Sequence, residues 1–362
     1  MREIAILLPG PRREPVGGYK VLYQYGDYLS TVGWSITFMY LTDDFVCNSR
    51  FDGLKGIAKA FIIAHTEFYK WYDFRSTQIT HKVISDLKKI KAEQYDVIIC
   101  SAVETFIYVK EFTNIENKKL AYFVQGYEVW NIGKLKLEET LSYSDVDYIT
   151  ISDDLAKRIA QAGGKQIIML YNGIDKNDFF INKKWLEREE NSFLFLYHPG
   201  EHKGCDVLLE AICKVKSENN NFKFSCFSAY PKPQNFPEFI DYTYRPTIPQ
   251  LNELYNDHRF FICSSVHEGF GLTPAEAAFA GVIIITTRNG GVEQYVTDME
   301  TGFVLEQRTC DAFARKIKEV AAKGDALYEF SIISNEKIRK QLDLQKNFIR
   351  LDEYLTEKCK LL

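Results

Sequence analysis

The sequence lacks the cysteine patterns of disulfide-bonded and zinc-binding proteins. Its eight cysteines are scattered, no two of them form a CxxC pair, and none has a histidine partner at metal-ligand spacing. This distribution favours reduced thiols in a cytosol. An excess of basic residues is also missing, because the net charge is -4 and the pI is near 6. We therefore expect no nucleic acid as a partner.

Long apolar runs, internal repeats and low-complexity segments are missing as well. The first apolar run, Ile4 to Leu8, is too short for the core of a signal peptide or for a membrane span. The sequence thus predicts a cytoplasmic protein. Peripheral contact with the inner face of a membrane is left open.

Apolar runs that look like strands buried on both faces alternate with helix-like segments. A first series lies at 3–8, 35–40, 96–100, 120–124, 147–151 and 166–171, and a second at 193–197, 222–227, 259–263 and 282–286. Such alternation predicts right-handed βαβ units and parallel sheets. With 362 residues the chain exceeds one ordinary core. We therefore predict an α/β protein with two Rossmann-like, doubly wound domains that face a cleft.

A turn signal at Asn172-Gly173 separates the two series. We predict an N-terminal domain over residues 1–172 and a C-terminal domain over 173–341, with the link between them near 172–190. The tail at 342–362 is amphipathic, which is typical of a packing helix, and it can pack back on the N-terminal domain.

The most informative stretch is a glycine-bracketed turn that opens a helix after the strand at 259–263. Thr273 suits the N-cap and Pro274 the first helical position, so the helix would direct its unpaired N–H groups and its positive dipole end toward Gly271 and Leu272. A diphosphate or a sugar oxygen is favoured at such a place.

The same turn sets two carboxylates, Glu268 and Glu276, eight residues apart. With Glu268 on the strand side and Glu276 in the first helical turn, both can face one pocket and accept hydrogen bonds from sugar hydroxyls. The alternative is a capping box, in which Glu276 only returns to the N-cap amide of Thr273.

Two further loops follow predicted strands. Lys203 precedes a helix that Asp206 can cap, and a lysine there can meet a diphosphate, although an exposed loop lysine is the alternative. Gly17-Gly18 precedes a helix that begins at Tyr19 or Lys20, and it permits close backbone approach in a mobile loop. The pair lacks the GxGxxG spacing of a dinucleotide site, and a flexible turn is its alternative.

Together these residues resemble the retaining nucleotide-sugar-dependent glycosyltransferases of family 4, which have the two-domain GT-B fold. The resemblance covers nearly the whole chain. Glu268 and Glu276 match the family's E-x7-E motif, Lys203-Gly204 its donor-phosphate lysine, Asn172 to Asp175 its hinge, and Gly17-Gly18 its N-terminal glycine loop.

The resemblance implies a role for each matching residue. Glu276 would hold the donor ribose and Glu268 a hydroxyl of the transferred sugar. Lys203 and the amides near Gly271 and Leu272 would stabilise the leaving diphosphate. The remaining residues expected to bind the donor are Gly17, Gly18, His198, Phe270 and Thr273.

The chain departs from the family at two positions. His198 stands five residues before Lys203, where the family has a phosphate-binding arginine, and it is cationic only when its pKa is raised. Gln125 stands where many members carry a histidine near the transferred sugar. It can hydrogen-bond a hydroxyl but cannot take a proton, and we expect it to act in catalysis with Lys203 and Glu268. The run Tyr122 to Gln125 is similar to a subgroup with bacterial rhamnosyltransferases, which points to a polysaccharide pathway.

The first hypothesis is a retaining transferase that moves a hexosyl unit from a nucleotide sugar to a glycan or lipid-linked saccharide. The donor phosphate would take the acceptor's proton, with the N-terminal domain binding the acceptor and the C-terminal domain the donor. No cofactor and no metal are expected, because Asp43-Asp44 and Asp153-Asp154 are better explained as turn and N-cap residues than as a DxD motif. The second hypothesis is a catalytically silent sugar-nucleotide-binding subunit, motivated by His198 and Gln125. A phosphorylase or epimerase is the third.

The sequence does not show which sugar or nucleotide the donor contains. Tyr244, Arg245 and Pro246 are expected near the base or the sugar. Aromatic residues between 51 and 95 can dock a glycan or a membrane, with a packed aromatic cluster as the alternative. They include Phe68, Tyr69, Trp71, Tyr72 and Phe74.

Overall fold

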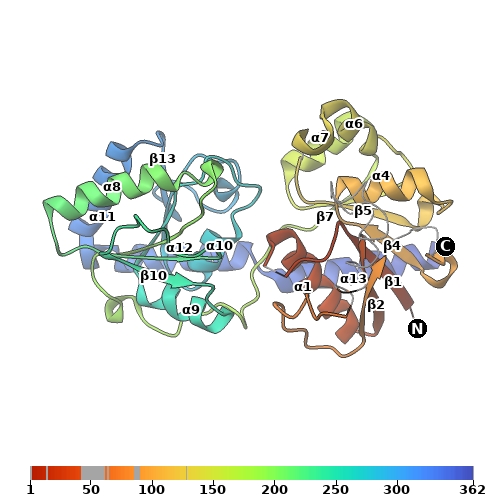
Figure 1. Ribbon diagram of the computed structural model, residues 1–362, viewed down its shortest axis with the longest axis horizontal. Coiled ribbons are helices and arrows are strands. Elements are labelled where there is room, and N and C mark those ends of the chain that lie inside the picture. Colours follow the sequence, from red (N-terminus) through yellow and green to blue (C-terminus); the bar gives the residue numbers. More distant parts are fainter. Residues whose placement is uncertain are drawn as a thin grey trace. The chain divides into compact units, whose positions relative to one another are not determined.

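The computed structural model describes residues 2–13, 15–41, 62, 65–84, 90–127 and 129–361. The chain divides into two compact units, of which the first comprises Met1–Tyr171 with Lys346–Leu362 and the second Asn172–Gln345. Each unit has its own parallel sheet covered by helices (Figure 1). The pair Asp43-Asp44 lies outside the described residues.

The first unit contains a seven-stranded sheet in the order β3-β2-β1-β4-β5-β6-β7, in which every neighbouring pair is parallel. Its strands are β1 (Arg2–Leu8), β2 (Trp34–Leu41), β3 (Ile79–Ile84), β4 (Val97–Cys100), β5 (Leu120–Val124), β6 (Asp147–Thr150) and β7 (Gln166–Met169). Its helices are α1 (Gly17–Thr31), α4 (Val103–Phe112), α5 (Val129–Ile132), α6 (Lys134–Thr140), α7 (Asp153–Ala162) and α13 (Leu344–Leu361), which starts in the second unit. Because the order runs outward from β1 in both directions, the sheet is doubly wound.

The second unit contains a six-stranded parallel sheet in the order β10-β9-β8-β11-β12-β13. Its strands are β8 (Ser192–Leu196), β9 (Lys223–Ser228), β10 (Ile240–Tyr244), β11 (Phe260–Cys263), β12 (Ile283–Thr287) and β13 (Gly302–Leu305). Its helices are α8 (Cys205–Glu218), α9 (Ile248–Asp257), α10 (Leu272–Phe279), α11 (Cys310–Lys323) and α12 (Tyr328–Gln341). The prediction of two doubly wound parallel sheets is confirmed.

Strand residues of the second unit alternate between two apolar cores. Phe193 and Phe195 of β8 belong to one core with α8 and α11, whereas Leu194 belongs to the other core with α9 and α10. Figure 1 shows α8 and α11 on one side of this sheet and α9, α10 and α12 on the other. A strand with cores on both faces needs apolar residues at successive positions, which explains the continuous apolar runs.

The boundary between the units differs from the predicted link at 172–190. The first unit ends at Tyr171, and the chain from Asn172 onward belongs to the second. The buried guanidinium of Arg188 holds this segment in place. It donates hydrogen bonds to the carbonyls of Lys183 at 3.0 Å, His258 at 3.2 Å and Ala280 at 2.7 Å. Burial lowers the pKa of Arg188 to about 10. The predicted domain boundary after residue 172 thus lies one residue from the observed one, and the polar stretch that follows is part of the second unit.

Helix α13 packs on the first unit. Phe348 stacks on Tyr28 with ring centroids 4.7 Å apart. Lys358 forms an ion pair of 2.7 Å with Asp147 of β6, and both side chains are less than one tenth exposed. Tyr354 donates a hydrogen bond to the same carboxylate.

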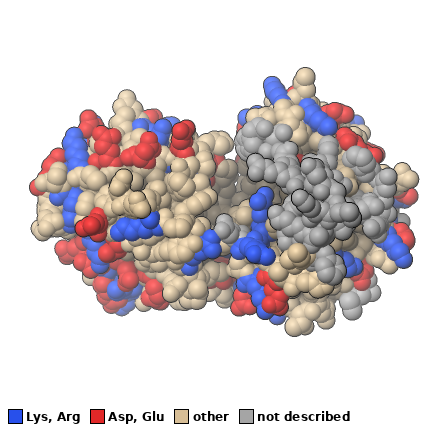
Figure 2. Space-filling view, viewed as in Figure 1, with Lys and Arg blue, Asp and Glu red and all other residues tan. Residues whose placement is uncertain are grey.

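Acidic and basic side chains are intermixed on the visible face of the second unit (Figure 2). In the described part of the chain, no helix combines the length and the apolar character needed to cross a bilayer.

Candidate functional site

The N-terminus of α10 is built on Gly271 rather than on Thr273. Gly271 is the N-cap with φ +81°, so Thr273 and Pro274 are the second and third helical residues, and the predicted cap was wrong. A Cβ on Gly271 would lie 2.6 Å from Val292 Cγ2, which leaves no room for a side chain. The Tyr295 hydroxyl donates to the Gly271 carbonyl at 2.6 Å. The first N–H groups of the helix have no acceptor within it and are available to a ligand.

Lys203 is held by a second glycine. Gly204 has φ +59° and is the N-cap of α8. Asp206, which was predicted to be the cap, lies in the first turn of the helix instead. A Cβ on Gly204 would lie 2.4 Å from the Ser264 carbonyl oxygen. The Ser264 hydroxyl donates to the Lys203 carbonyl at 2.9 Å. The loop after β8 is thereby fastened to the loop after β11.

This fastening brings Lys203 onto Glu268. Lys203 Nζ lies 2.6 Å from Glu268 Oε1, and the Ser265 hydroxyl donates to the same oxygen at 2.6 Å. The Lys203 and Glu268 side chains are 20% and 15% exposed. Glu268 is also held by its backbone, because its N–H donates to the Asn289 carbonyl at 2.9 Å.

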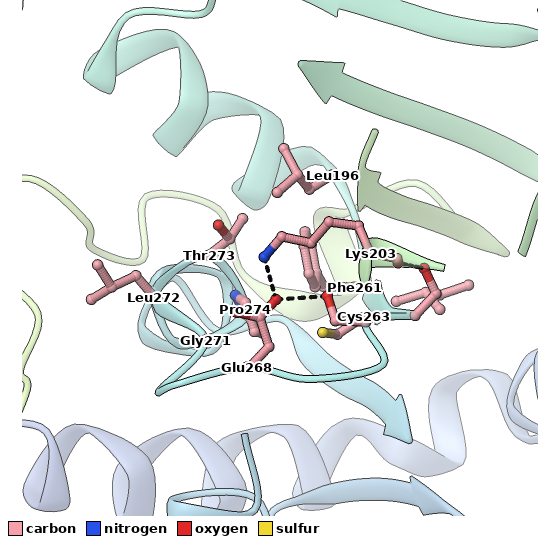
Figure 3. Close-up of a pocket in the computed structure, with 12 residues that line it drawn as sticks. Leu196, Lys203, Phe261, Cys263, Glu268, Gly271, Leu272, Thr273 and Pro274 are labelled. Carbon is pink, nitrogen blue, oxygen red and sulfur yellow. Dashed lines mark hydrogen bonds and ion pairs between the residues drawn. The ribbon is translucent and has the colours of Figure 1, made fainter. Parts of the chain in front are cut away.

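These residues line one pocket, shown in Figure 3, that continues to the N-terminus of α10. Its lining contains five residues that the sequence predicted: Lys203, Glu268, Gly271, Leu272 and Thr273. The pocket measures about 40 Å³. That volume holds a few water molecules.

Glu276 is the fifth residue of α10 and not in its first turn, and the helix has no side-chain cap, so the capping-box alternative was wrong. The Tyr255 hydroxyl lies 3.2 Å from Glu276 Oε2 and also donates to the Thr273 carbonyl at 3.3 Å. Burial, and then the charge of Glu276, raise the pKa of Tyr255 well above its usual value. Tyr255 therefore stays protonated and can donate to Glu276.

The surroundings of His198 favour its neutral form. Burial, followed by the proximity of His202 and Lys203, lowers its pKa. The Gly200 N–H donates to His198 Nδ1 at 2.9 Å, so the ring proton of the neutral form is on Nε2. The imidazole can thus offer one N–H but no positive charge.

Phe270 does not present its side chain to the pocket. The ring is 5% exposed and packs in the core against Tyr295, with ring centroids 5.1 Å apart. The predicted contact of Phe270 with the donor can therefore be made only by its backbone.

In the first unit, Gly17 and Gly18 are the first two residues of α1, and Val16 is the N-cap. The helix therefore begins two residues before Tyr19, earlier than predicted. Gln125, which follows β5, donates from Nε2 to the Gly18 carbonyl at 3.2 Å. The structure thus brings Gln125 and the glycine pair together.

Residues 192–323 match the protein family described as Glycosyl transferases group 1. The chain is 22% identical to an uncharacterized glycosyltransferase of Methanocaldococcus jannaschii over 76% of this chain and 77% of the relative. It is 24% identical to the capsular polysaccharide biosynthesis glycosyltransferase CapM of Staphylococcus aureus, over 55% of this chain and 60% of CapM.

Among solved structures, Anabaena HepE in complex with UDP-glucose superimposes with a TM-score of 0.69 and 14% identity, covering both chains completely. Such a likeness shows the fold. The chain has the GT-B fold, and the family model and the relatives that it matches are those of glycosyltransferases. In this glycosyltransferase the matched segment contains every predicted site residue of the second unit, from His198 to Glu276. Gly17, Gly18 and Gln125 lie outside it.

Three residues of the glycosyltransferase site were missed in the sequence: Ser265, Tyr255 and Tyr295. Ser265 follows the predicted strand at 259–263, so its place at the carboxyl end of a strand was a usable signal. Tyr255 and Tyr295 lie far from their partners in the sequence and had no local signal. In the described part of this glycosyltransferase, no group of three or more His, Cys, Asp or Glu side chains is arranged to hold a metal ion.

The aromatic residues of segment 65–84 form a packed cluster with α1 and β2. The His81 ring stacks on Tyr69 with centroids 3.7 Å apart and lies 5.1 Å from Phe74. The Tyr40 hydroxyl lies 2.8 Å from His81 Nδ1 and 2.7 Å from the Tyr23 hydroxyl. Packing thus accounts for these aromatic residues of the glycosyltransferase.

Proposed function

We propose that this glycosyltransferase moves a hexosyl unit, with retention of configuration, from a nucleotide sugar to a hydroxyl of a glycan or lipid-linked saccharide. The observation that carries the proposal is the convergence of Lys203, Glu268 and the N-terminus of α10 on one pocket. The capsular function of CapM and the UDP-glucose complex of HepE support a polysaccharide pathway and a nucleotide-sugar donor.

Each polar group of the site suits one part of such a donor. The Lys203 ammonium and the N–H groups of Leu272 and Thr273 would bind the diphosphate. Glu268 would accept a hydrogen bond from a sugar hydroxyl. Glu276, with Oε2 held by Tyr255, would accept from the ribose.

The transfer breaks the bond between the anomeric carbon and the diphosphate oxygen and forms a bond from that carbon to the acceptor oxygen. The acceptor's proton passes to a donor phosphate oxygen on the same face. Because no enzyme base is needed, glutamine at position 125 is tolerated. Lys203 and the helix N-terminus stabilise the charge that develops on the leaving diphosphate, and neutral His198 adds an Nε2–H donor.

The proposal includes no cofactor and no metal. Acceptor binding is assigned to the first unit, where Gln125 and Gly18 meet. A cytoplasmic location, peripheral contact with the membrane and the lack of a nucleic acid partner stay predictions, as does the cleft between the domains.

The test is release of nucleotide from a panel of nucleotide sugars in EDTA, with a mixture of glycan and lipid-linked acceptors present. Wild type is compared with Glu276→Ala and with Glu336→Ala, which removes an exposed carboxylate of α12. We expect release from one donor, a loss of at least tenfold in Glu276→Ala, and no change in Glu336→Ala. Release that needs an added divalent cation would contradict metal independence.

A catalytically silent sugar-nucleotide-binding subunit is the second candidate, favoured by neutral His198 and by Gln125. It predicts that a nucleotide sugar binds but is not turned over with any acceptor.

For the transferase proposal, anomeric analysis of the product by NMR would decide between retention and inversion.

A further inference from the structure

The ion pair of Lys203 and Glu268 occupies the two groups that the proposed function needs for different parts of the donor. Lys203 would serve the diphosphate and Glu268 the sugar. At a separation of 2.6 Å, each satisfies the other. A ligand that draws Lys203 away must therefore leave Glu268 with Ser265 as its remaining donor in the pocket.

The cost of that separation depends on what the ligand gives back to Glu268. The carboxylate is 15% exposed, so water replaces the lost ammonium incompletely. A nucleotide sugar supplies a hydroxyl to Glu268 together with a diphosphate for Lys203. A nucleoside diphosphate supplies only the anion, and its negative charge is brought close to the carboxylate.

We propose that the pair of Lys203 and Glu268 makes the site reject the nucleoside diphosphate that remains after sugar transfer. In this role Glu268 promotes product release, in addition to binding the sugar. Once the sugar has left, Glu268 loses its hydroxyl donor, Lys203 returns to the carboxylate, and the diphosphate loses its cation. This inference rests on the proposed function and adds a selection between substrate and product at the same site.

Ser265 determines how strongly the site rejects the nucleoside diphosphate. Its hydroxyl donates to the same Oε1 that Lys203 contacts, so it partly satisfies Glu268 when the lysine moves away. Removing this hydroxyl makes separation of the pair more costly. Ser265→Ala and Glu268→Gln should therefore change the affinity for a nucleoside diphosphate in opposite directions.

The experiment is isothermal titration calorimetry of the full chain with UDP, GDP, ADP and dTDP and with one sugar derivative of each. For the nucleotide that binds, we expect Glu268→Gln to bind the free diphosphate about tenfold more tightly than wild type, because the competing charge is gone. The same variant should bind the nucleotide sugar no more tightly than wild type. Ser265→Ala should weaken diphosphate binding by about threefold while changing nucleotide-sugar binding less.

Glu218→Gln is the matched control. It breaks another lysine–glutamate pair of the second unit, Lys318 with Glu218 at 2.8 Å, in which both side chains are 44% exposed. Its affinities should equal those of wild type.

Equal or weaker diphosphate binding by Glu268→Gln would overturn the inference and leave the proposed function standing. If no probe binds wild type, the proposed function falls, and the inference falls with it. If Glu268→Gln does not fold, Ser265→Ala decides alone, and tighter or unchanged diphosphate binding by that variant overturns the inference.

Discussion

The hydroxyl of Tyr255 shares its proton between Glu276 Oε2 and the Thr273 carbonyl. Tyr255→Phe keeps the buried ring and removes the donor 3.2 Å from Glu276 Oε2. Losing one such hydrogen bond costs about 1 kcal/mol. We therefore expect KM for the donor to rise about fivefold with kcat nearly unchanged, because the ribose is bound equally in the ground and transition states.

Initial-rate kinetics with the donor that the nucleotide-release test selects measure KM and kcat separately. Tyr328→Phe, at an exposed position of α12, is the control. A fall in kcat as large as the fall in kcat/KM would show that Tyr255 acts in another way.

Gly204 is the residue on which the position of Lys203 depends. Gly204→Ala places a Cβ 2.4 Å from the Ser264 carbonyl oxygen. It also forces an alanine into the left-handed backbone conformation of Gly204. The strained backbone costs about 1–2 kcal/mol and the displacement of the loop about as much again. We expect a loss of about 3 kcal/mol in the stability of the second unit, together with weaker nucleotide binding.

Denaturant unfolding and calorimetry test this expectation. Gly324→Ala separates the two costs, because Gly324 lies in the same unit and also has a positive φ, of +46°, but nothing within 4 Å of the added Cβ. Equal destabilisation by the two variants would mean that the contact with Ser264 contributes nothing.

The sequence identified those site residues whose signals are local. Lys203 and Glu268 each follow a predicted strand, and strands of one parallel sheet end at the same edge, so their meeting could be expected. Their direct ion pair could not, because it depends on the contact of Gly204 with Ser264. The bond from Tyr255 to Glu276 joins α9 to α10, and no spacing in the sequence reveals it.

At the scale of elements, the interior strands and β7 were predictable from apolar runs, whereas three edge strands, β3, β10 and β13, lie outside those runs. The ten apolar runs of the two series all correspond to strands. β3, which contains Thr80, His81 and Lys82, has a half-exposed pattern instead of a buried run. β13 has four residues and begins with a glycine. β3 and β10 are partly exposed and therefore need no continuous apolar run, whereas β13 is buried but short.

His81 of β3 is buried in the aromatic cluster, and we expect this burial to make the stability of the first unit depend on pH. Burial lowers the pKa of His81 to about 4, from 6.5 in the unfolded chain. Between these two values the unfolded chain binds more protons than the folded one, so stability falls as pH falls from 6.5 to 4. We expect a loss of roughly 3 kcal/mol over this window.

His81→Phe keeps a ring that can stack on Tyr69 and removes the titration. The free energy of unfolding of the first unit, measured in urea between pH 4 and 7, should therefore depend less on pH in this variant than in wild type. Parallel curves would show that His81 does not carry the effect.

At the scale of the whole molecule, the two series of apolar runs predicted two sheets. The turn signal at Asn172-Gly173 placed the boundary one residue from the division after Tyr171, and the tail was expected to be able to pack on the first unit, as α13 does. Helix α13 begins in the second unit at Leu344 and belongs to the first unit from Lys346 onward. Its amphipathic pattern shows that one face is buried, but no pattern states which sheet covers that face. The partner is specified by contacts distant in sequence, such as Lys358 with Asp147.

This division predicts that the two units differ in their ability to fold alone. Residues 172–345 contain both ends of the second unit, where the Ile174 N–H donates to the Leu342 carbonyl at 3.0 Å, and should unfold cooperatively as an isolated fragment. Residues 1–171 lack the buried Phe348, Leu351 and Leu355 and leave Asp147 without Lys358. Each lost apolar side chain removes about 2 kcal/mol, and a buried unpaired carboxylate adds to the loss. This fragment should therefore show no cooperative melting by circular dichroism. A chain that joins 1–171 to 346–362 through a flexible linker should recover the transition, whereas cooperative melting of 1–171 alone would mean that α13 is dispensable for the first unit.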